Sequence, residues 1–226
     1  MALQVLTSEQ RKLLSNAVTA ARSRPGLGAE DGALKALQAL AVDQHEPFPK
    51  MTREQRELRN RLRAHGRQLG DARDKQKGTQ EIRLLGREVA FEQWHRMLFA
   101  RFLAENQLLI DPRFGVAISM EEAAELAKEA GTDTWSYAAR CAQSLLPAIF
   151  RSDDPSLAVE LPPESKIALE KLLGGLDAAI FTASDALGWT YQFWQSEESE
   201  QVKKKGGSIG ADDISARTQF FTEHYM

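Results

Sequence analysis

The sequence predicts a mainly α-helical, multi-helix fold, and three kinds of observation support this class. Apolar residues recur at three- and four-residue spacing through most of the chain. Ser, Thr and Asp, the residues that cap helices, stand in front of several of these stretches. Clean alternation of apolar and polar residues is rare, so the only strand candidates are the short segments 116–118 and 157–159.

The N-terminal part of the chain contains three expected helices. The first begins at Thr7, which has the spacing of a capping box, and ends at Pro25. A second, short helix is expected over 33–42. A third begins at its cap Thr52 and runs to about Leu69. The polar stretch that follows is expected to be a loop.

The strongest core candidate is a long helix expected from about Thr79 to Gln107. It carries a broad apolar stripe, which is typical of a helix that packs on several neighbours. We therefore expect Trp94, Leu98 and Phe102 to be buried.

Cap and punctuation residues predict the remaining helices. Ser119 begins a Ser-x-x-Glu capping box, and Asp133 or Thr134 caps the next helix. Helical periodicity returns over 167–173, and Ser184 is the expected cap of the last clear helix.

These elements suggest three segments. Residues 1–78 form an N-terminal helical region with a basic helix, residues 79–208 form a helical core domain, and residues 209–226 begin a further domain. The final residues, 222–226, have the pattern of a helix cap followed by one turn. We therefore expect the chain to be truncated before that further domain.

Composition excludes several classes of protein. The chain has 226 residues, of which 42% are hydrophobic and 27% charged, as in ordinary globular proteins. Its single cysteine, Cys141, excludes an internal disulfide framework and a cysteine-rich zinc site, and its apolar neighbours predict a buried side chain. No run of residues resembles a signal peptide or a membrane span, so we expect a cytoplasmic protein that does not contact a membrane.

Charge is strongly segregated along the chain. Segment 50–77 holds ten cationic and four acidic residues, a net charge of +6, whereas the rest of the chain carries −9. An arginine-rich helix of this kind suits contacts to the phosphate backbone of double-stranded DNA. The expected DNA-binding residues of this helix are Arg53, Arg56, Arg59, Arg63 and Arg67. One alternative is a solvated helix face with its own ion pairs. Another is that these arginines pair with acidic residues of the C-terminal half, such as Glu197, Glu198 and Glu200.

Other chemistry-bearing residues give weaker signals. Lys203, Lys204 and Lys205 precede two glycines in an expected exposed turn and are further DNA-contact candidates. Core packing is favoured over base stacking for the aromatic residues Trp189, Tyr191, Phe193 and Trp194. Glu92 and His95 lie one helical turn apart, but without a second such pair we expect no metal site. No phosphate-binding loop, dinucleotide-binding turn or nucleophile elbow is present, so we expect no catalytic residue.

Two stretches resemble a known family. They are FEQWHRMLFARFLAENQLL over 91–109 and LGWTYQFWQSEESEQVKKKGGSIGADDISARTQFFTEHYM over 187–226. Both are similar to the N-terminal portion of large adenine-specific DNA methyltransferases. These comprise the PglX-type enzymes of BREX systems, their DISARM relatives and the related type II restriction-modification methylases.

The resemblance implies a function in phage defence or restriction-modification. Such enzymes transfer a methyl group from S-adenosylmethionine to the exocyclic amine of adenine in DNA, after flipping the base from the stack. In the family, 209–226 would begin the α/β methyltransferase domain, and Phe221 and Thr222 would line the cofactor. The Asn-Pro-Pro-Tyr catalytic tetrapeptide is absent. We therefore expect the chain to be inactive alone, to bind no cofactor alone, and to work with the remainder of the enzyme or other defence subunits.

Two other classes of function stay open. The chain could be a separate, non-catalytic helical subunit that binds DNA or a protein partner. It could also be a structural helical protein unrelated to the family.

Overall fold

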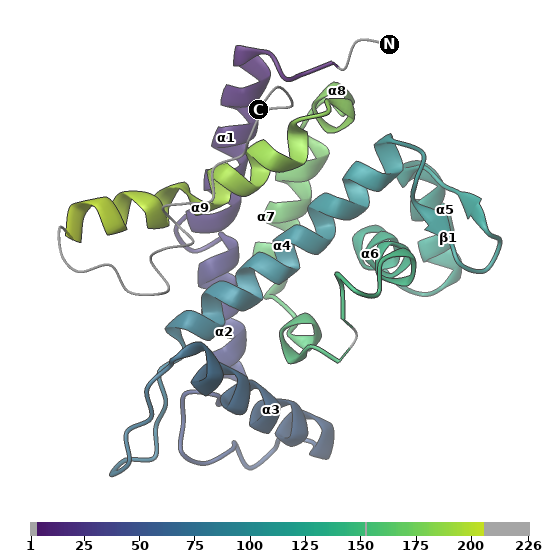
Figure 1. Ribbon diagram of the computed structural model, residues 1–226. Coiled ribbons are helices and arrows are strands. Elements are labelled where there is room, and N and C mark those ends of the chain that lie inside the picture. Colours follow the sequence, from purple (N-terminus) through teal and green to yellow (C-terminus); the bar gives the residue numbers. More distant parts are fainter. Residues whose placement is uncertain (1–3, 152, 206–226) are drawn as a thin grey trace. The chain divides into compact units, whose positions relative to one another are not determined.

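The computed structural model describes residues 4–151 and 153–205, and it confirms the mainly helical fold class (Figure 1). Within these residues, no helix has both the length and the apolar character that crossing a membrane requires. The α-helices are α1 (Ser8–Ser23), α2 (Ala29–Ala39), α3 (Arg53–Leu69), α4 (Arg83–Glu105), α5 (Met120–Glu129), α6 (Thr134–Leu145), α7 (Pro163–Gly174), α8 (Ala178–Thr182) and α9 (Ala186–Lys205). The short elements are strands β1 (Ile110–Asp111) and β2 (Val116–Ala117) and the 3-10 helix η1 (Pro155–Ala158).

The chain divides into two compact units. One combines Met1–Ala20 with Gly175–Met226, and the other is Ala21–Gly174. The boundary expected between residues 78 and 79 therefore falls inside the second unit, and the expected segment 209–226 lies outside the described residues.

Local sequence signals explain where most helices begin. Thr52 and Ser119 each accept a hydrogen bond from the backbone N–H three residues later, and the glutamine or glutamate there completes the capping box. Asp133 caps α6, because its side chain accepts a hydrogen bond from the backbone N–H of Ser136. Gly70, with φ of +105°, ends α3 in the left-handed conformation that favours glycine. These caps confirm the predicted starts of three helices.

Helix α4 forms the centre of the unit Ala21–Gly174, where it packs against α2 and α6 (Figure 1). Trp94 and Leu98 are 1% and 3% exposed, which confirms them as core residues. Phe102 is partly buried and packs against the core cluster that α4 shares with α5 and α6. The helix is shorter than predicted at its N-terminus, because the residues before Arg83 form a separate turn.

Strands β1 and β2 pair antiparallel beside this cluster. The strand predicted over 116–118 is thus confirmed at Val116–Ala117. The strand predicted over 157–159 is wrong, because Pro155 and its cap Asp154 start the 3-10 helix η1 there. A buried polar network fixes the β1 end, since the hydroxyl of Tyr137 donates to the carboxylate of Asp111.

In the unit formed by Met1–Ala20 and Gly175–Met226, polar contacts join the two segments. The backbone N–H of Leu6 donates to Asp185 Oδ1 at 2.8 Å, and Ser184 N donates to the carbonyl of Gln4 at 2.9 Å. Helix α9 begins directly after Asp185, two residues beyond the predicted cap Ser184. The sequence did not predict α8, a helix of five residues.

Candidate nucleic-acid interface

The five arginines predicted on α3 do not form one exposed face. Arg59 and Arg63 are only 5% and 7% exposed, Arg56 is half-buried, and Arg53 and Arg67 are exposed. Arg59 and Arg63 share the inward face of α3 with Leu62 and Gly66, in the i, i+3, i+4, i+7 pattern of a core-facing stripe. Arg59 and Arg63 therefore lie on the same side of α3 as Leu62 and not on a solvent face shared with the other arginines.

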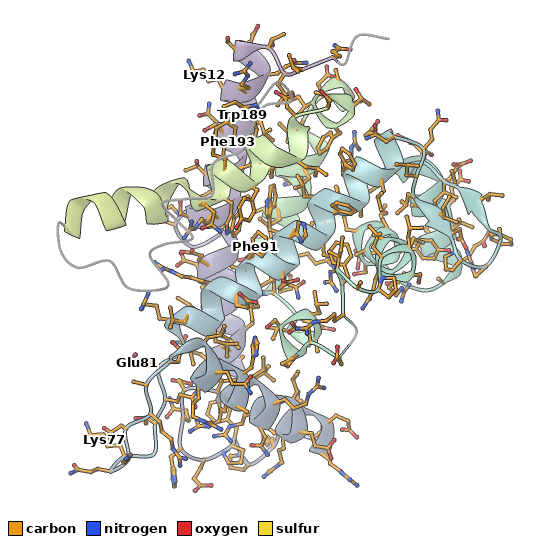
Figure 2. The ribbon with its side chains drawn as sticks, viewed as in Figure 1. Lys12, Lys77, Glu81, Phe91, Trp189 and Phe193 are labelled. Atoms are coloured by element: carbon orange, nitrogen blue, oxygen red, sulfur yellow. The ribbon has the colours of Figure 1, made fainter. Side chains whose placement is uncertain are left out.

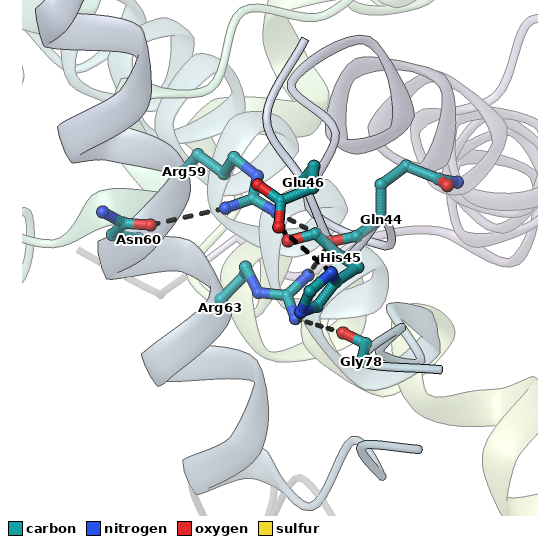
Figure 3. Close-up of polar contacts among 7 residues, drawn as sticks. All are labelled: Gln44, His45, Glu46, Arg59, Asn60, Arg63 and Gly78. Atoms are coloured by element: carbon teal, nitrogen blue, oxygen red, sulfur yellow. Dashed lines mark hydrogen bonds and ion pairs between the residues drawn. The ribbon is translucent and has the colours of Figure 1, made fainter. Parts of the chain in front are cut away.

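The guanidinium group of Arg59 is occupied by backbone carbonyls that follow α2 (Figure 3). Its Nε donates to the carbonyl of Ala41 at 2.8 Å, and its Nη2 donates to those of Gln44 and His45 at 2.7 and 3.0 Å. Burial lowers the pKa of Arg59, and the nearby carboxylates of Glu46 and Asp43 only partly offset this. Buried carbonyls need donors, and Arg59 supplies three hydrogen bonds to them.

Arg63 joins two segments that are separate in sequence. Its Nη1 donates to the carbonyls of Val42, at 2.6 Å, and of Gln44, while Nη2 donates to the carbonyl of Gly78 at 2.9 Å (Figure 3). Burial is the largest cause of its lowered pKa, followed by repulsion from neighbouring arginines. Arg63 therefore links the chain after α2 to the loop between α3 and α4.

That loop is an ordered turn, which we call the basic hairpin, residues 72–80. Arg73 and Gln80 form an antiparallel bridge, and the N–H of Asp74 donates to the carbonyl of Thr79 at 3.0 Å. The carboxylate of Asp74 accepts from two backbone N–H groups at the tip, at 2.8 and 3.1 Å. Gly78 has φ of +69°, which favours glycine at the return of the turn.

The base of the basic hairpin is fixed to the flanking helices. The buried carboxylate of Asp71 accepts from the N–H groups of Leu84 and Leu85 at 2.9 and 3.0 Å, at the start of α4. Gln80 donates to the carbonyl of Arg63 at 3.0 Å and accepts from Arg67 Nη1 at 3.1 Å. The turn is thus held from both α3 and α4.

Three exposed cations lie on this hairpin: Arg73, Lys75 and Lys77. Figure 2 shows Lys77 at the outer end of the loop, away from the helices. None of the three forms an ion pair within the part of the chain that the structure describes. The hairpin therefore presents uncompensated positive charge on a fixed backbone.

The surrounding segment remains cationic after its buried charges are set aside. Without the buried Arg59, Arg63 and Asp71, segment 50–77 has eight cationic and three acidic residues. On α3 itself, Arg53 pairs with Glu57 at 2.9 Å. Three of the eight cations lie on the hairpin with one acidic residue, and five lie on or before α3 with two acidic residues, so both parts offer positive charge to a polyanion.

Two other sets of predicted site residues lie towards the C-terminus. Lys203, Lys204 and Lys205 are the last residues of helix α9, so the exposed turn expected for them is wrong. Phe221 and Thr222, the expected cofactor-lining residues, lie outside the described residues.

The aromatic residues of α9 are packed rather than displayed as a group. Trp194 is 5% exposed, which confirms core packing at that position. Trp189 stacks on Phe193 with 5.4 Å between ring centroids, and Arg11 lies 5.0 Å from the Trp189 ring centroid. Tyr191, at 39% exposed, is the member that faces solvent most.

The three remaining candidate residues, His95, Glu92 and Cys141, are partly or fully buried in the fold. His95 stacks on Phe91 at 5.1 Å, and burial lowers its pKa. Glu92 is partly buried, and that burial, with repulsion from Glu88 and Asp154, raises its pKa to about 7. Across residues 4–151 and 153–205, no three His, Cys, Asp or Glu side chains gather as a metal site. Cys141 is buried as predicted, and burial raises the pKa of its thiol to about 11, which leaves it unreactive.

Comparison of the chain with protein-family models, curated proteins and solved structures finds no match.

Proposed function

We propose that the chain is the helical, DNA-contacting part of an adenine-specific, S-adenosylmethionine-dependent DNA methyltransferase of phage defence or restriction-modification. The observation that carries the DNA contact is the basic hairpin, with Arg73, Lys75 and Lys77 exposed and unpaired in the described part of the chain. The resemblance of 91–109 and 187–226 to such enzymes supports the enzyme class.

The hairpin suits phosphate contacts better than base readout. Cations on an anchored turn can neutralise phosphates without first ordering the backbone, and each contact releases condensed counterions. Such contacts fix position and register but carry no sequence information. Recognition of the target sequence is accordingly assigned to the remainder of the enzyme.

The chemical step is also assigned to the remainder of the enzyme. The sequence contains no Asn-Pro-Pro-Tyr tetrapeptide, no phosphate-binding loop and no nucleophile elbow. In this proposal the chain works in the cytoplasm, where it holds double-stranded DNA while its partner binds S-adenosylmethionine. Phe221 and Thr222 remain predicted contributors to the cofactor wall.

Salt-dependent binding tests the DNA contact. The 226-residue chain is titrated into a labelled random-sequence duplex, and affinity is measured by fluorescence anisotropy at several salt concentrations. Lys75→Gln/Lys77→Gln should lower the slope of log affinity against log salt by about 1.8, or about 0.9 for each phosphate that is no longer neutralised. The matched control is Lys128→Gln/Lys171→Gln, which removes two exposed lysines elsewhere in the same unit. Equal slopes for the two double variants would overturn the proposal.

A methyl-transfer assay tests whether the chemical step lies outside this chain. The purified chain, supplied with labelled S-adenosylmethionine and DNA, should transfer no label, because the catalytic tetrapeptide is absent. Label in the DNA would show that the chemistry resides in this chain. The coding DNA downstream of the codon for residue 226 distinguishes the enzyme from an independent binding subunit: an Asn-Pro-Pro-Tyr in the same frame supports the enzyme, and a separate start codon favours the independent subunit.

A further inference from the structure

A cavity of about 580 Å³ lies between α4, α6, η1 and α7 and shares no residue with the basic hairpin. This volume is within the range of roughly 300–1,000 Å³ that is typical of small-molecule sites. Its wall is built by buried Gln93, whose amide donates to the carbonyls of Ser156 and Val159 at 3.2 and 2.8 Å. These bonds hold the η1 segment against α4.

Arg96 lines this cavity and lacks an ionic partner. Its Nη2 donates to Gln93 Oε1 at 2.6 Å, while its buried Nε meets no acceptor in the part of the chain that the structure describes. No described carboxylate lies within ion-pair distance of the guanidinium group. Burial lowers the pKa of Arg96, and the more distant Asp133 and Glu92 only partly offset this. Arg96 is only partly exposed, and a partly desolvated cation without a counter-charge favours an anion beside it.

The other charged residues of the cavity sum to zero, so Arg96 gives the cavity its single positive excess. Lys166 pairs with Asp133 at 2.6 Å, so these two charges compensate each other. Arg140 and Glu160 are exposed members of the lining. Both α6 and α7 begin at the cavity, and the N-terminal ends of helices add positive potential.

The other lining residues are apolar except for Thr132 and Ser136. They include the half-buried Trp135 and the aliphatic or thioether side chains of Met97, Leu157, Val159 and Leu161. The cavity thus combines polar groups, which can orient an organic ligand, with an apolar surface that can contact its body. Trp135 supplies an aromatic surface that suits a planar ligand body.

We propose that this cavity binds a small organic anion, with its carboxylate or phosphate on Arg96 and its planar apolar body beside Trp135. The proposal does not depend on the DNA contact, because the cavity and the hairpin use different residues. The charge-assisted bond to the buried guanidinium supplies most of the selectivity for an anion over a neutral ligand.

Ligand titration followed by NMR tests this site. Benzoate, phenyl phosphate and neutral benzamide are added to the labelled 226-residue chain, and the Trp135 indole N–H and the backbone amides of α6 are observed. Either anion should give saturable shifts there, with the tighter one identifying the head group, and benzamide should bind more weakly. Equal binding of benzamide, or the absence of saturable shifts at Trp135, would overturn the proposal.

Two variants test which arginine of the cavity contacts the bound anion. Arg96→Gln should weaken anion binding about tenfold or more, as expected for loss of a buried charged hydrogen bond. Arg140→Gln, at the exposed rim, should weaken it by about two- to fivefold and keeps the test intact if Arg96→Gln does not fold. Lys128→Gln is the surface control. Unchanged affinity in a folded Arg96→Gln variant, or in Arg140→Gln if the first does not fold, would contradict the assignment.

Discussion

Arg63→Met should destabilise the chain strongly even though it replaces a polar side chain by an apolar one of similar length. Arg63 is 7% exposed and donates to the carbonyls of Val42, Gln44 and Gly78. Methionine can fill much of the space but donates no hydrogen bond. The substitution therefore leaves the carbonyls of Val42 and Gly78 without their donor, leaves Gln44 with Arg59 alone, and releases the basic hairpin from the chain after α2.

The magnitude follows from these contacts. Each buried carbonyl that is left without a donor costs about 1–3 kcal/mol, and because two carbonyls lose the same side chain their contributions are not strictly additive. We therefore expect Arg63→Met to lower the free energy of unfolding by about 3–5 kcal/mol. Arg63→Lys should lose less, because its single ammonium keeps the charge but cannot reach all three carbonyls.

Urea unfolding followed by circular dichroism measures this change. Arg53→Met is the matched control, because the Arg53 side chain is 87% exposed and pairs only at the surface. Its free energy of unfolding should match that of the unmodified chain within error. A loss below about 1 kcal/mol for Arg63→Met would refute the structural role assigned to Arg63.

Three further changes probe other parts of the molecule. Because burial and two nearby carboxylates raise the pKa of Glu92 to about 7, the folded chain holds that proton more tightly than the unfolded chain. The free energy of unfolding should thus fall as pH rises from the ordinary value of 4.5 to about 7. Glu92→Gln should make this fall smaller in urea titrations and leave the part that the raised pKa values of Glu88 and Glu170 contribute, so an undiminished fall would contradict the Glu92 pKa. Tyr137→Phe removes the hydroxyl that donates a hydrogen bond to fully buried Asp111. It should lower the free energy of unfolding, measured by thermal unfolding, by about 1–3 kcal/mol. An unchanged midpoint temperature would show that this hydrogen bond is dispensable. Gly78→Ala places a Cβ 1.9 Å from His45 Cδ2 at a residue with φ of +69°. The substitution should therefore strain the basic hairpin by about 1–2 kcal/mol and speed tryptic cleavage after Lys77. Equal cleavage rates in the two proteins would argue against an ordered turn.

Much of the fold could be predicted because its signals are local. The capping boxes at Thr52 and Ser119 involve residues three positions apart, so the sequence alone shows both partners. The apolar stripe around Trp94 likewise predicts burial from spacing. The η1 segment was misassigned because three apolar residues resemble a strand, while the turn-forming Asp154 and Pro155 before them decide the structure.

The candidate interface was only partly predictable, for a physical reason. Arginines at three- and four-residue spacing look the same in sequence whether they face solvent or backbone carbonyls. The carbonyls that bind Arg59 and Arg63 come from residues 14 to 21 positions away, which periodicity does not identify. Leu62 between the two arginines, with Gly66 one turn on, was the available signal that this face points inward. The excess of charge in the segment was predictable, and its presentation on the hairpin was not.

Lysine protection by DNA tests the central claim most directly. The 226-residue chain is acetylated briefly with and without a random-sequence duplex, and the reactivity of each lysine is read by mass spectrometry. Lys75 and Lys77 should lose reactivity when DNA is present, whereas the exposed Lys128 and Lys171 should keep theirs. Protection of the latter pair with no protection on the hairpin would contradict the account.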